Sequence, residues 1–135
     1  MAYIQFLGAA GVVTGSKHLI NTSDDESGKP GSQVLIDCGL FQGAKKLENS
    51  NRLPKRGPLQ KLDSVVLTHA HLDHAWGVSA ITGAFPAAGV LLHRDDLPLY
   101  HNLPMQAQMF GFPAPRPVEP TAFMADGDRL SVGRE

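Results

Sequence analysis

Three histidines and one aspartate cluster at His69, His71, Asp73 and His74. Imidazole nitrogens and carboxylate oxygens are ligands that suit zinc, and also iron and manganese. Residues two apart in an extended loop point the same way, so His69 and His71 can converge on one ion. Asp73 and His74 can serve a second ion, and Asp73 can also act as the catalytic residue that orients a metal-bound water. The alternative is a polar loop with three unrelated histidines. Because only 6 His occur in 135 residues, three of them within six positions are not expected by chance.

Short apolar runs predict the elements that position this cluster. Ser64–Leu67 precedes it directly and predicts a buried strand, at whose end a functional loop is commonly built. Other strands are predicted at residues 3–7, 17–21, 34–36 and 90–92, and at 129–132 after a turn at 126–128. Helices are predicted at 44–50 and 75–84, and at 95–110 with an interruption by Pro98 and Pro104. The proline-rich stretch 111–120 predicts an extended connector.

Composition places the chain among ordinary globular proteins. A length of 135 residues with 42% hydrophobic and 19% charged residues fits a single domain, residues 1–135, with a real core. A net charge of −1 and a pI near 6.6 give no overall basic footprint for nucleic acid. A loose basic stretch is read as a solvated loop; it comprises Lys45, Lys46, Arg52, Lys55, Arg56 and Lys61.

The same composition bears on the compartment. The single cysteine, Cys38, excludes an internal disulfide and is expected in the core. The first residues lack a basic segment followed by a long apolar stretch, so no signal peptide is predicted. No run approaches the ~18 apolar residues needed to cross a bilayer. We expect a cytoplasmic protein with no membrane partner.

The cluster has the form H-x-H-x-D-H, which resembles the metallo-β-lactamase superfamily. The blocks Phe6–Ser16 and Leu35–Gly43 resemble its β-CASP branch of RNA- and DNA-processing nucleases. Gly89–Tyr100 and Asp126–Gly133 are instead similar to the glyoxalase II-like hydrolases of small substrates. The two halves of the chain therefore indicate different relatives within one superfamily, as a mosaic chain would; a truncated chain is the expectation where downstream family ligands are missing.

The resemblance implies a fold and a cofactor. The fold class is α/β, the N-terminal half of a metallo-β-lactamase αββα sandwich, in which helices cover a mixed sheet. The complete family site holds two zinc ions, with manganese or iron as alternatives. Further family ligands are expected downstream, and neither His93 nor His101 matches their motifs. The chain is thus predicted to be an incomplete domain that exposes a sheet face and self-associates.

Other candidate residues have two interpretations each. Asp37 follows a predicted strand, and either supports the metal loop, as the resemblance implies, or caps a turn. Gly8, Gly11 and Gly15 either approach a phosphate or simply join two strands. His93 is expected to be a surface or helix-capping residue. His18 and His101 have no motif context, and Trp76 is expected in the core.

Three functions remain open. The first is phosphodiester hydrolysis of RNA or DNA by a metal-bound hydroxide, which the metal forms by lowering the pKa of water. The second is hydrolysis of a small thioester or hydroxyacyl compound. The third is an inactive metal-binding module that acts through another chain. Enzyme activity is expected only if a C-terminal half or a partner completes the site.

Overall fold

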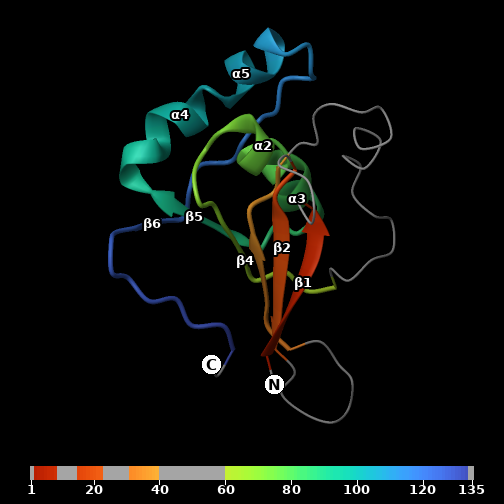
Figure 1. The fold of residues 1–135 in the computed structure, drawn as a ribbon, viewed down its shortest axis with the longest axis vertical. Coiled ribbons are helices and arrows are strands. Elements are labelled where there is room, and N and C mark those ends of the chain that lie inside the picture. Colours follow the sequence, from red (N-terminus) through yellow and green to blue (C-terminus); the bar gives the residue numbers. More distant parts are fainter. Residues whose placement is uncertain (1, 9–14, 23–30, 40–59, 134–135) are drawn as a thin grey trace.

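The computed structural model describes residues 2–8, 15–22, 31–39 and 60–133. In this part of the chain, one sheet contains six strands, which lie side by side in the order of the sequence (Figure 1). They are β1 (Ala2–Gly8), β2 (Lys17–Thr22), β3 (Gln33–Ile36), β4 (Ser64–Val66), β5 (Gly89–His93) and β6 (Ala122–Met124). The expected helix at residues 44–50 lies outside the described residues, as does most of the basic stretch.

The sheet is mixed. The strands β1, β2 and β3 pair antiparallel, whereas β3, β4, β5 and β6 pair parallel. Because the carboxyl ends of parallel strands meet at one edge, the segments after Ile36 and Val66 leave the sheet side by side. That edge carries the candidate site.

Helices cover one face of the sheet (Figure 1). Their bounds are α2 (Leu72–Ala75), α3 (Val78–Ala84), the short 3-10 helix η2 (Arg94–Asp96), α4 (Leu97–His101) and α5 (Leu103–Met109). The core lies between this helical layer and a row of paired strand residues, Leu19, Leu35, Val65 and Val90, none more than 1% exposed. Burying such side chains contributes about 1.5–3 kcal/mol each, so this layer holds the sheet edge in place.

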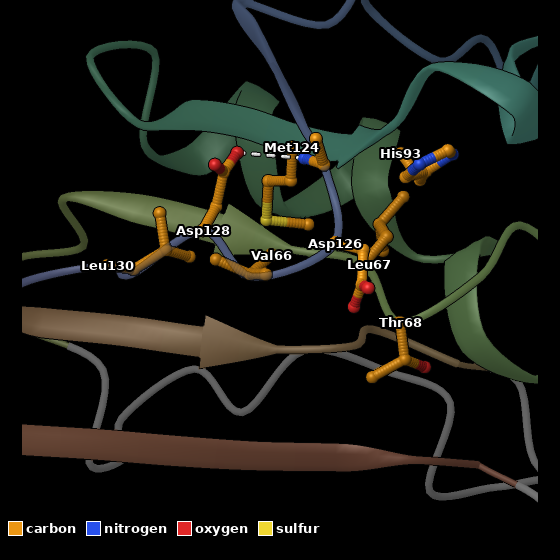
Figure 2. Close-up of a pocket in the computed structure, with 9 residues that line it drawn as sticks. Val66, Leu67, Thr68, His93, Met124, Asp126, Asp128 and Leu130 are labelled. Atoms are coloured by element: carbon orange, nitrogen blue, oxygen red, sulfur yellow. Dashed lines mark hydrogen bonds between the residues drawn. The ribbon is translucent and has the colours of Figure 1, made fainter.

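The opposite sheet face, here called the open face, carries the alternate residues. One row across the paired strands consists of Phe6, His18, Ile36, Val66, Leu91 and Ala122. The turn at residues 125–128 and Leu130 lie beside this row and enclose a cleft of about 370 Å³ with Val66, Thr68 and His93 (Figure 2). Phe6 and Ile4 on β1 remain 63% and 59% exposed.

Most of the predicted elements are confirmed, and two differ. The predicted helix 75–84 is two helices, because Gly77 interrupts it and donates its N–H to the Cys38 carbonyl at 2.7 Å. A Cβ at Gly77 would lie 2.6 Å from Cys38 Sγ, so the close approach requires glycine. The interruption in 95–110 is confirmed, and falls at Asn102 between α4 and α5.

The predicted last strand is wrong. Residues 129–132 form no strand, and β6 lies instead before the turn, where Ala122–Met124 pairs with Leu91–His93. The turn itself is confirmed, since Asp128 N donates to Ala125 O at 3.1 Å and Asp128 Oδ2 accepts from Ala125 N at 2.8 Å. The connector at 112–120 is extended, and Cys38 is buried, as expected. Within the described residues, no helix has the length and apolar character needed to cross a bilayer.

Candidate metal centre

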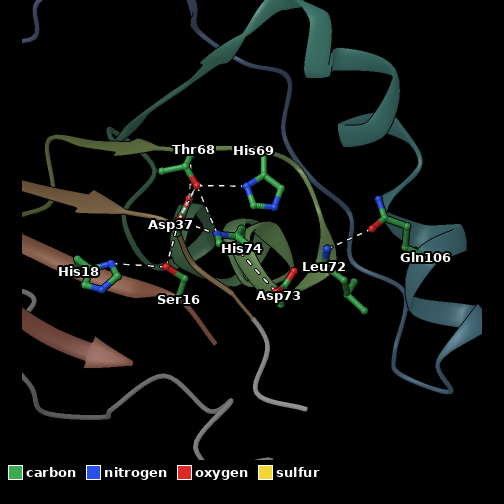
Figure 3. Close-up of polar contacts among 9 residues, drawn as sticks. All are labelled: Ser16, His18, Asp37, Thr68, His69, Leu72, Asp73, His74 and Gln106. Atoms are coloured by element: carbon green, nitrogen blue, oxygen red, sulfur yellow. Dashed lines mark hydrogen bonds and ion pairs between the residues drawn. The ribbon is translucent and has the colours of Figure 1, made fainter. Parts of the chain in front are cut away.

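The histidine loop, residues 68–74, leaves the carboxyl end of β4 and runs into α2 (Figure 3). It lies directly beside Asp37, the first residue after β3. Asp37 has a positive φ of 60° and its side chain is only 2% exposed. An aspartate tolerates this left-handed conformation better than most residues do. The bend at this residue places its carboxylate against the loop.

Asp37 accepts hydrogen bonds from the segment at Ser16 and from both ends of the histidine loop. Thr68 donates its N–H to Oδ1 at 2.8 Å and its hydroxyl lies 2.8 Å from Oδ2. Ser16 donates its hydroxyl to Oδ2 at 3.1 Å, and His74 Nδ1 lies 2.8 Å from the same oxygen. These donors compensate the burial of the charge. Of the two interpretations of Asp37, the geometry therefore favours support of the histidine loop.

The contact with Asp37 also sets the tautomer of His74. A carboxylate only accepts hydrogen bonds, so Nδ1 of His74 carries the proton. In this tautomer of the neutral ring, Nε2 carries the lone pair, and Nε2 lies 3.5 Å from Asp73 Oδ2. This arrangement is typical of metal-ligating histidines. One ring nitrogen binds the metal, and the N–H of the other ring nitrogen donates to a carboxylate.

His69 lies against His74, with ring centroids 3.9 Å apart. Burial lowers the pKa of His69, and the neighbouring imidazoles of His74 and His71 lower it further. The ring is therefore neutral at pH 7 and has a free lone pair. Its Nδ1 lies 3.4 Å from the Thr68 hydroxyl. Because the single hydroxyl proton of Thr68 is donated to Asp37, this oxygen acts as an acceptor toward His69.

Three of the four predicted ligands come together. His69, Asp73 and His74 each offer an atom, and these atoms all lie within 4.8 Å of one another. Two ligand atoms on one zinc ion lie at most about 4.3 Å apart, so small side-chain rotations close the set. Two imidazoles and a carboxylate fit a divalent transition metal.

His71 stands slightly apart. Its ring centroid is 5.0 Å from that of His69, but its nitrogens are not among the three converging ligand atoms. The side chain is exposed, at the N-cap position of α2. The grouping thus differs from the expected pairs His69 with His71 and Asp73 with His74. The metal-ligand roles of all four residues stay a prediction.

Backbone contacts fix the loop to the neighbouring segments. Cys38 N donates to His74 O at 2.6 Å, and Ser16 N donates to Asp73 O at 3.1 Å. A Cβ at Gly39 would lie only 1.5 Å from Asp73 O, so Gly39 has no space for a side chain. The segments around residues 16 and 38 therefore hold the backbone of the loop in place at Asp73 and His74.

The remaining histidines lie outside this group. His93 caps η2 by accepting from Asp95 N at 3.2 Å, which confirms the capping interpretation. His101 is exposed and pairs with Glu119 at 3.0 Å. His18 contacts Ser16 at 3.5 Å on the open face. Trp76 is half-buried against the core and donates to Pro113 O at 3.0 Å. Gly11 lies outside the described residues, so the phosphate interpretation of that turn stays a prediction.

Sequence reasoning missed three residues at the site. Ser16 and Thr68 donate to Asp37, and Gln106 of α5 contacts the backbone of the histidine loop (Figure 3). Thr68 directly precedes the motif, and this proximity is a signal that was available. Ser16 and Gln106 are 21 and 34 residues from their partners. Single-sequence patterns give no signal over such separations.

Comparisons with known proteins agree with this geometry. The family model of the Metallo-beta-lactamase superfamily matches residues 28–135. A ribonuclease of Thermus thermophilus is 48% identical over 67 residues, covering 50% of this chain and 14% of that protein. Ribonuclease Z of Bradyrhizobium diazoefficiens is 34% identical over 112 residues, covering 76% of this chain and 34% of that protein.

A solved structure extends the likeness to three dimensions. A protein crystallised in a di-iron-bound form superposes with a TM-score of 0.56 at 28% identity, over 95% of this chain and 56% of that one. The chain thus spans about half of this solved relative, and a third or less of the two ribonucleases. The expected α/β fold, the N-terminal half of the family's sandwich, is confirmed. The chain belongs to the metallo-beta-lactamase superfamily.

Proposed function

We propose that this chain is the metal-binding half of a hydrolase that cleaves phosphodiester bonds in RNA or DNA. The observation that supports this most directly is the convergence of His69, Asp73 and His74 beside the buried Asp37. Two relatives named as ribonucleases support nucleic acid as the substrate class. The di-iron form of a third relative supports the need for a metal.

Each residue has a separate role in this proposal. His69 and His74 hold the metal through ring nitrogens, with His71 as a further ligand beside His69. A bound divalent ion supplies Lewis acidity, which activates water and stabilises charge on the phosphate. Asp73 is both a ligand and the residue that accepts a hydrogen bond from the attacking water and orients it. Asp37 holds His74 in the tautomer with a free Nε2.

We propose zinc as the metal, in two sites, with manganese or iron as alternatives. Imidazole and carboxylate ligands suit all three, so the ligand set itself supports a class of metals. Metal analysis of the purified chain by mass spectrometry, after equilibration with equal concentrations of zinc, manganese and iron, identifies the preferred ion. We expect zinc to be retained in the largest amount.

Two alternative functions are a hydrolase of small thioesters and an inactive metal-binding module. A thioester or hydroxyacyl substrate is favoured by the likeness of Gly89–Tyr100 to hydrolases of small molecules. An inactive metal-binding module is favoured by the donor set, because only three ligand atoms converge among the described residues. Three protein ligands and one water suit a single catalytic zinc ion, so three atoms are too few for the two ions of the complete family site.

One experiment distinguishes these functions. The metal-loaded chain is incubated with a fluorescent single-stranded RNA, the matching DNA and a thioester, and His69→Ala and His74→Ala are measured in parallel. His101→Ala is the matched control, because His101 is exposed and paired only with Glu119 in the described part. RNA cleavage lost in both site variants and retained in the control supports the nuclease. Metal binding without turnover on any substrate supports the inactive module.

The domain organisation, self-association and location of the protein are also proposals. We propose that residues 1–135 form a single, incomplete domain that self-associates through the open face. The exposed Ile4 and Phe6 on β1 support this. We propose a cytoplasmic location. Fractionation of cells that express the tagged chain tests the location.

A further inference from the structure

Gln106, a side chain of the separate helix α5, makes hydrogen bonds to the backbone of the histidine loop (Figure 3). Gln106 Oε1 accepts from Leu72 N at 3.1 Å. Its Nε2 donates to Ala70 O at 3.3 Å and to Leu99 O at 3.1 Å. One amide group therefore bridges the loop and the α4–α5 helix pair.

The loop needs this contact at one particular place. Leu72 is the first residue of α2, so its N–H has no acceptor inside the helix. His71 occupies the N-cap position but makes no side-chain cap hydrogen bond. α2 spans only Leu72–Ala75, and so short a helix is not stable alone. Gln106 supplies the missing N-terminal acceptor from a distant helix.

The bridge fixes the backbone on both sides of His71. Ala70 O and Leu72 N are both engaged, and His69 and Asp73 are each one residue further along. We propose that Gln106 is a positioning residue for the metal centre, which holds His69 and Asp73 in register for a common ion. This inference rests on the proposed metal-binding function. Misplacing a ligand by even a fraction of an ångström weakens a coordination bond.

The chain provides a matched control on the same helix. Gln108 is exposed on α5, whereas Gln106 is half-buried. Methionine has a similar length and helix propensity to glutamine, but has no amide group. Gln106→Met therefore removes the bridge, and Gln108→Met makes the same chemical change without removing it.

We expect Gln106→Met to raise the dissociation constant for zinc about 10-fold, at the lower end of the range for outer-shell partners. Competition with a chromogenic chelator measures this constant. Hydrogen exchange in the metal-free chain should show faster exchange of the Leu72 amide in Gln106→Met. Gln108→Met should match the wild type in both measurements.

A second variant separates the two arms of the bridge. Gln106→Glu keeps an acceptor for Leu72 N–H but loses the donor to Ala70 and Leu99. We expect it to retain the Leu72 protection and still to bind zinc more weakly than the wild type. This variant also serves as the test if Gln106→Met fails to fold.

The outcomes are distinguishable. A Gln106→Met chain with a lower thermal midpoint but an unchanged zinc constant would show a purely structural role and overturn the inference. If the wild type binds neither zinc nor manganese, the proposed function fails. The bridge is then judged by exchange alone: faster Leu72 exchange in Gln106→Met supports it, and unchanged exchange overturns it.

Discussion

Asp37 is the residue on which the candidate site depends most. It accepts hydrogen bonds from Ser16 and from both ends of the histidine loop, at Thr68 and His74. A buried carboxylate without such donors would be strongly unfavourable. The donors and the carboxylate thus stabilise one another, and His74 is oriented as a consequence.

We expect Asp37→Asn to weaken metal binding by about 10–100-fold, as the loss of an outer-shell carboxylate does. The neutral amide oxygen is a weaker acceptor for His74 Nδ1. The amide NH₂ group replaces one carboxylate oxygen and cannot accept the hydrogen bonds that this oxygen accepts. Isothermal titration with zinc measures the change. Asp95→Asn, at a side chain that is 90% exposed, is the control and should bind as the wild type does.

Thr68 contributes a hydroxyl that both donates and accepts. We expect Thr68→Val, which keeps the shape, to lower the free energy of unfolding by about 1–3 kcal/mol, because the buried Asp37 carboxylate loses a hydrogen-bond donor. Thr68→Ser should restore most of the stability. Urea denaturation followed by circular dichroism checks both values. Equal stability of the valine and serine variants would contradict the role of the hydroxyl.

Cys38 should be chemically inert in the folded chain. Burial raises the pKa of its thiol to about 12, although the nearby Lys17 opposes the shift. The reactive thiolate is therefore scarce at pH 8, whereas an unfolded cysteine ionises with a pKa of about 8.5. We expect iodoacetamide to modify the urea-unfolded chain rapidly and the native chain far more slowly, as mass spectrometry would show. Equal rates at pH 8 would contradict this burial.

The sequence predicts the ligand types of the site but not their supporting contacts. His69, Asp73 and His74 converge because they belong to one short loop after one strand, so local spacing carries the information. The sequence alone does not decide the role of Asp37, since an aspartate at the end of a strand looks the same whether it caps a turn or accepts hydrogen bonds from a loop 31 residues away. Contacts of that kind are set by tertiary structure.

The same distinction holds for the elements. Strands with a compact apolar run, such as β3, β4 and β5, were predicted because their burial is encoded locally. The predicted last strand lies on the wrong side of the turn at 126–128. A turn signal marks a change of direction but not which flank pairs with β5, and that choice is decided by non-local parallel pairing.

Two glycines near α3 provide a test of element packing. Gly77 separates α2 from α3 in contact with Cys38, whereas no atom of the described residues lies within 4 Å of a Cβ position at Gly83 inside α3. We expect Gly77→Ala to lower the free energy of unfolding by about 1–3 kcal/mol, the cost of overpacking. Gly83→Ala should raise it by about 0.5–1 kcal/mol, because alanine favours the helix. Thermal denaturation of both variants checks the opposite signs.

At the scale of the molecule, the two sheet faces differ in their partners. The helical layer covers the face that carries Leu19, Leu35 and Val65. On the open face, the described residues near the C-terminal turn line a cleft beside Val66. At the other end of this face, Ile4 and Phe6 of β1 are exposed to solvent. Among the described strands, β1 is also the edge of the sheet, with no described strand paired to its outer side. Apolar surface and a free edge lie together, and both favour association.

We therefore expect the chain to self-associate through β1 and the open face. The weight-average mass from sedimentation should rise with concentration above the 14.5 kDa of a single chain. Ile4→Lys should reduce this rise, because a charge at the interface is costly to bury. Met109→Lys is the matched control: Met109 is 76% exposed on α5, in the helical layer, and its substitution should leave association unchanged. A wild-type mass that stays at 14.5 kDa over the concentration range, or an equal effect of both lysines, would show that the open face is not the interface.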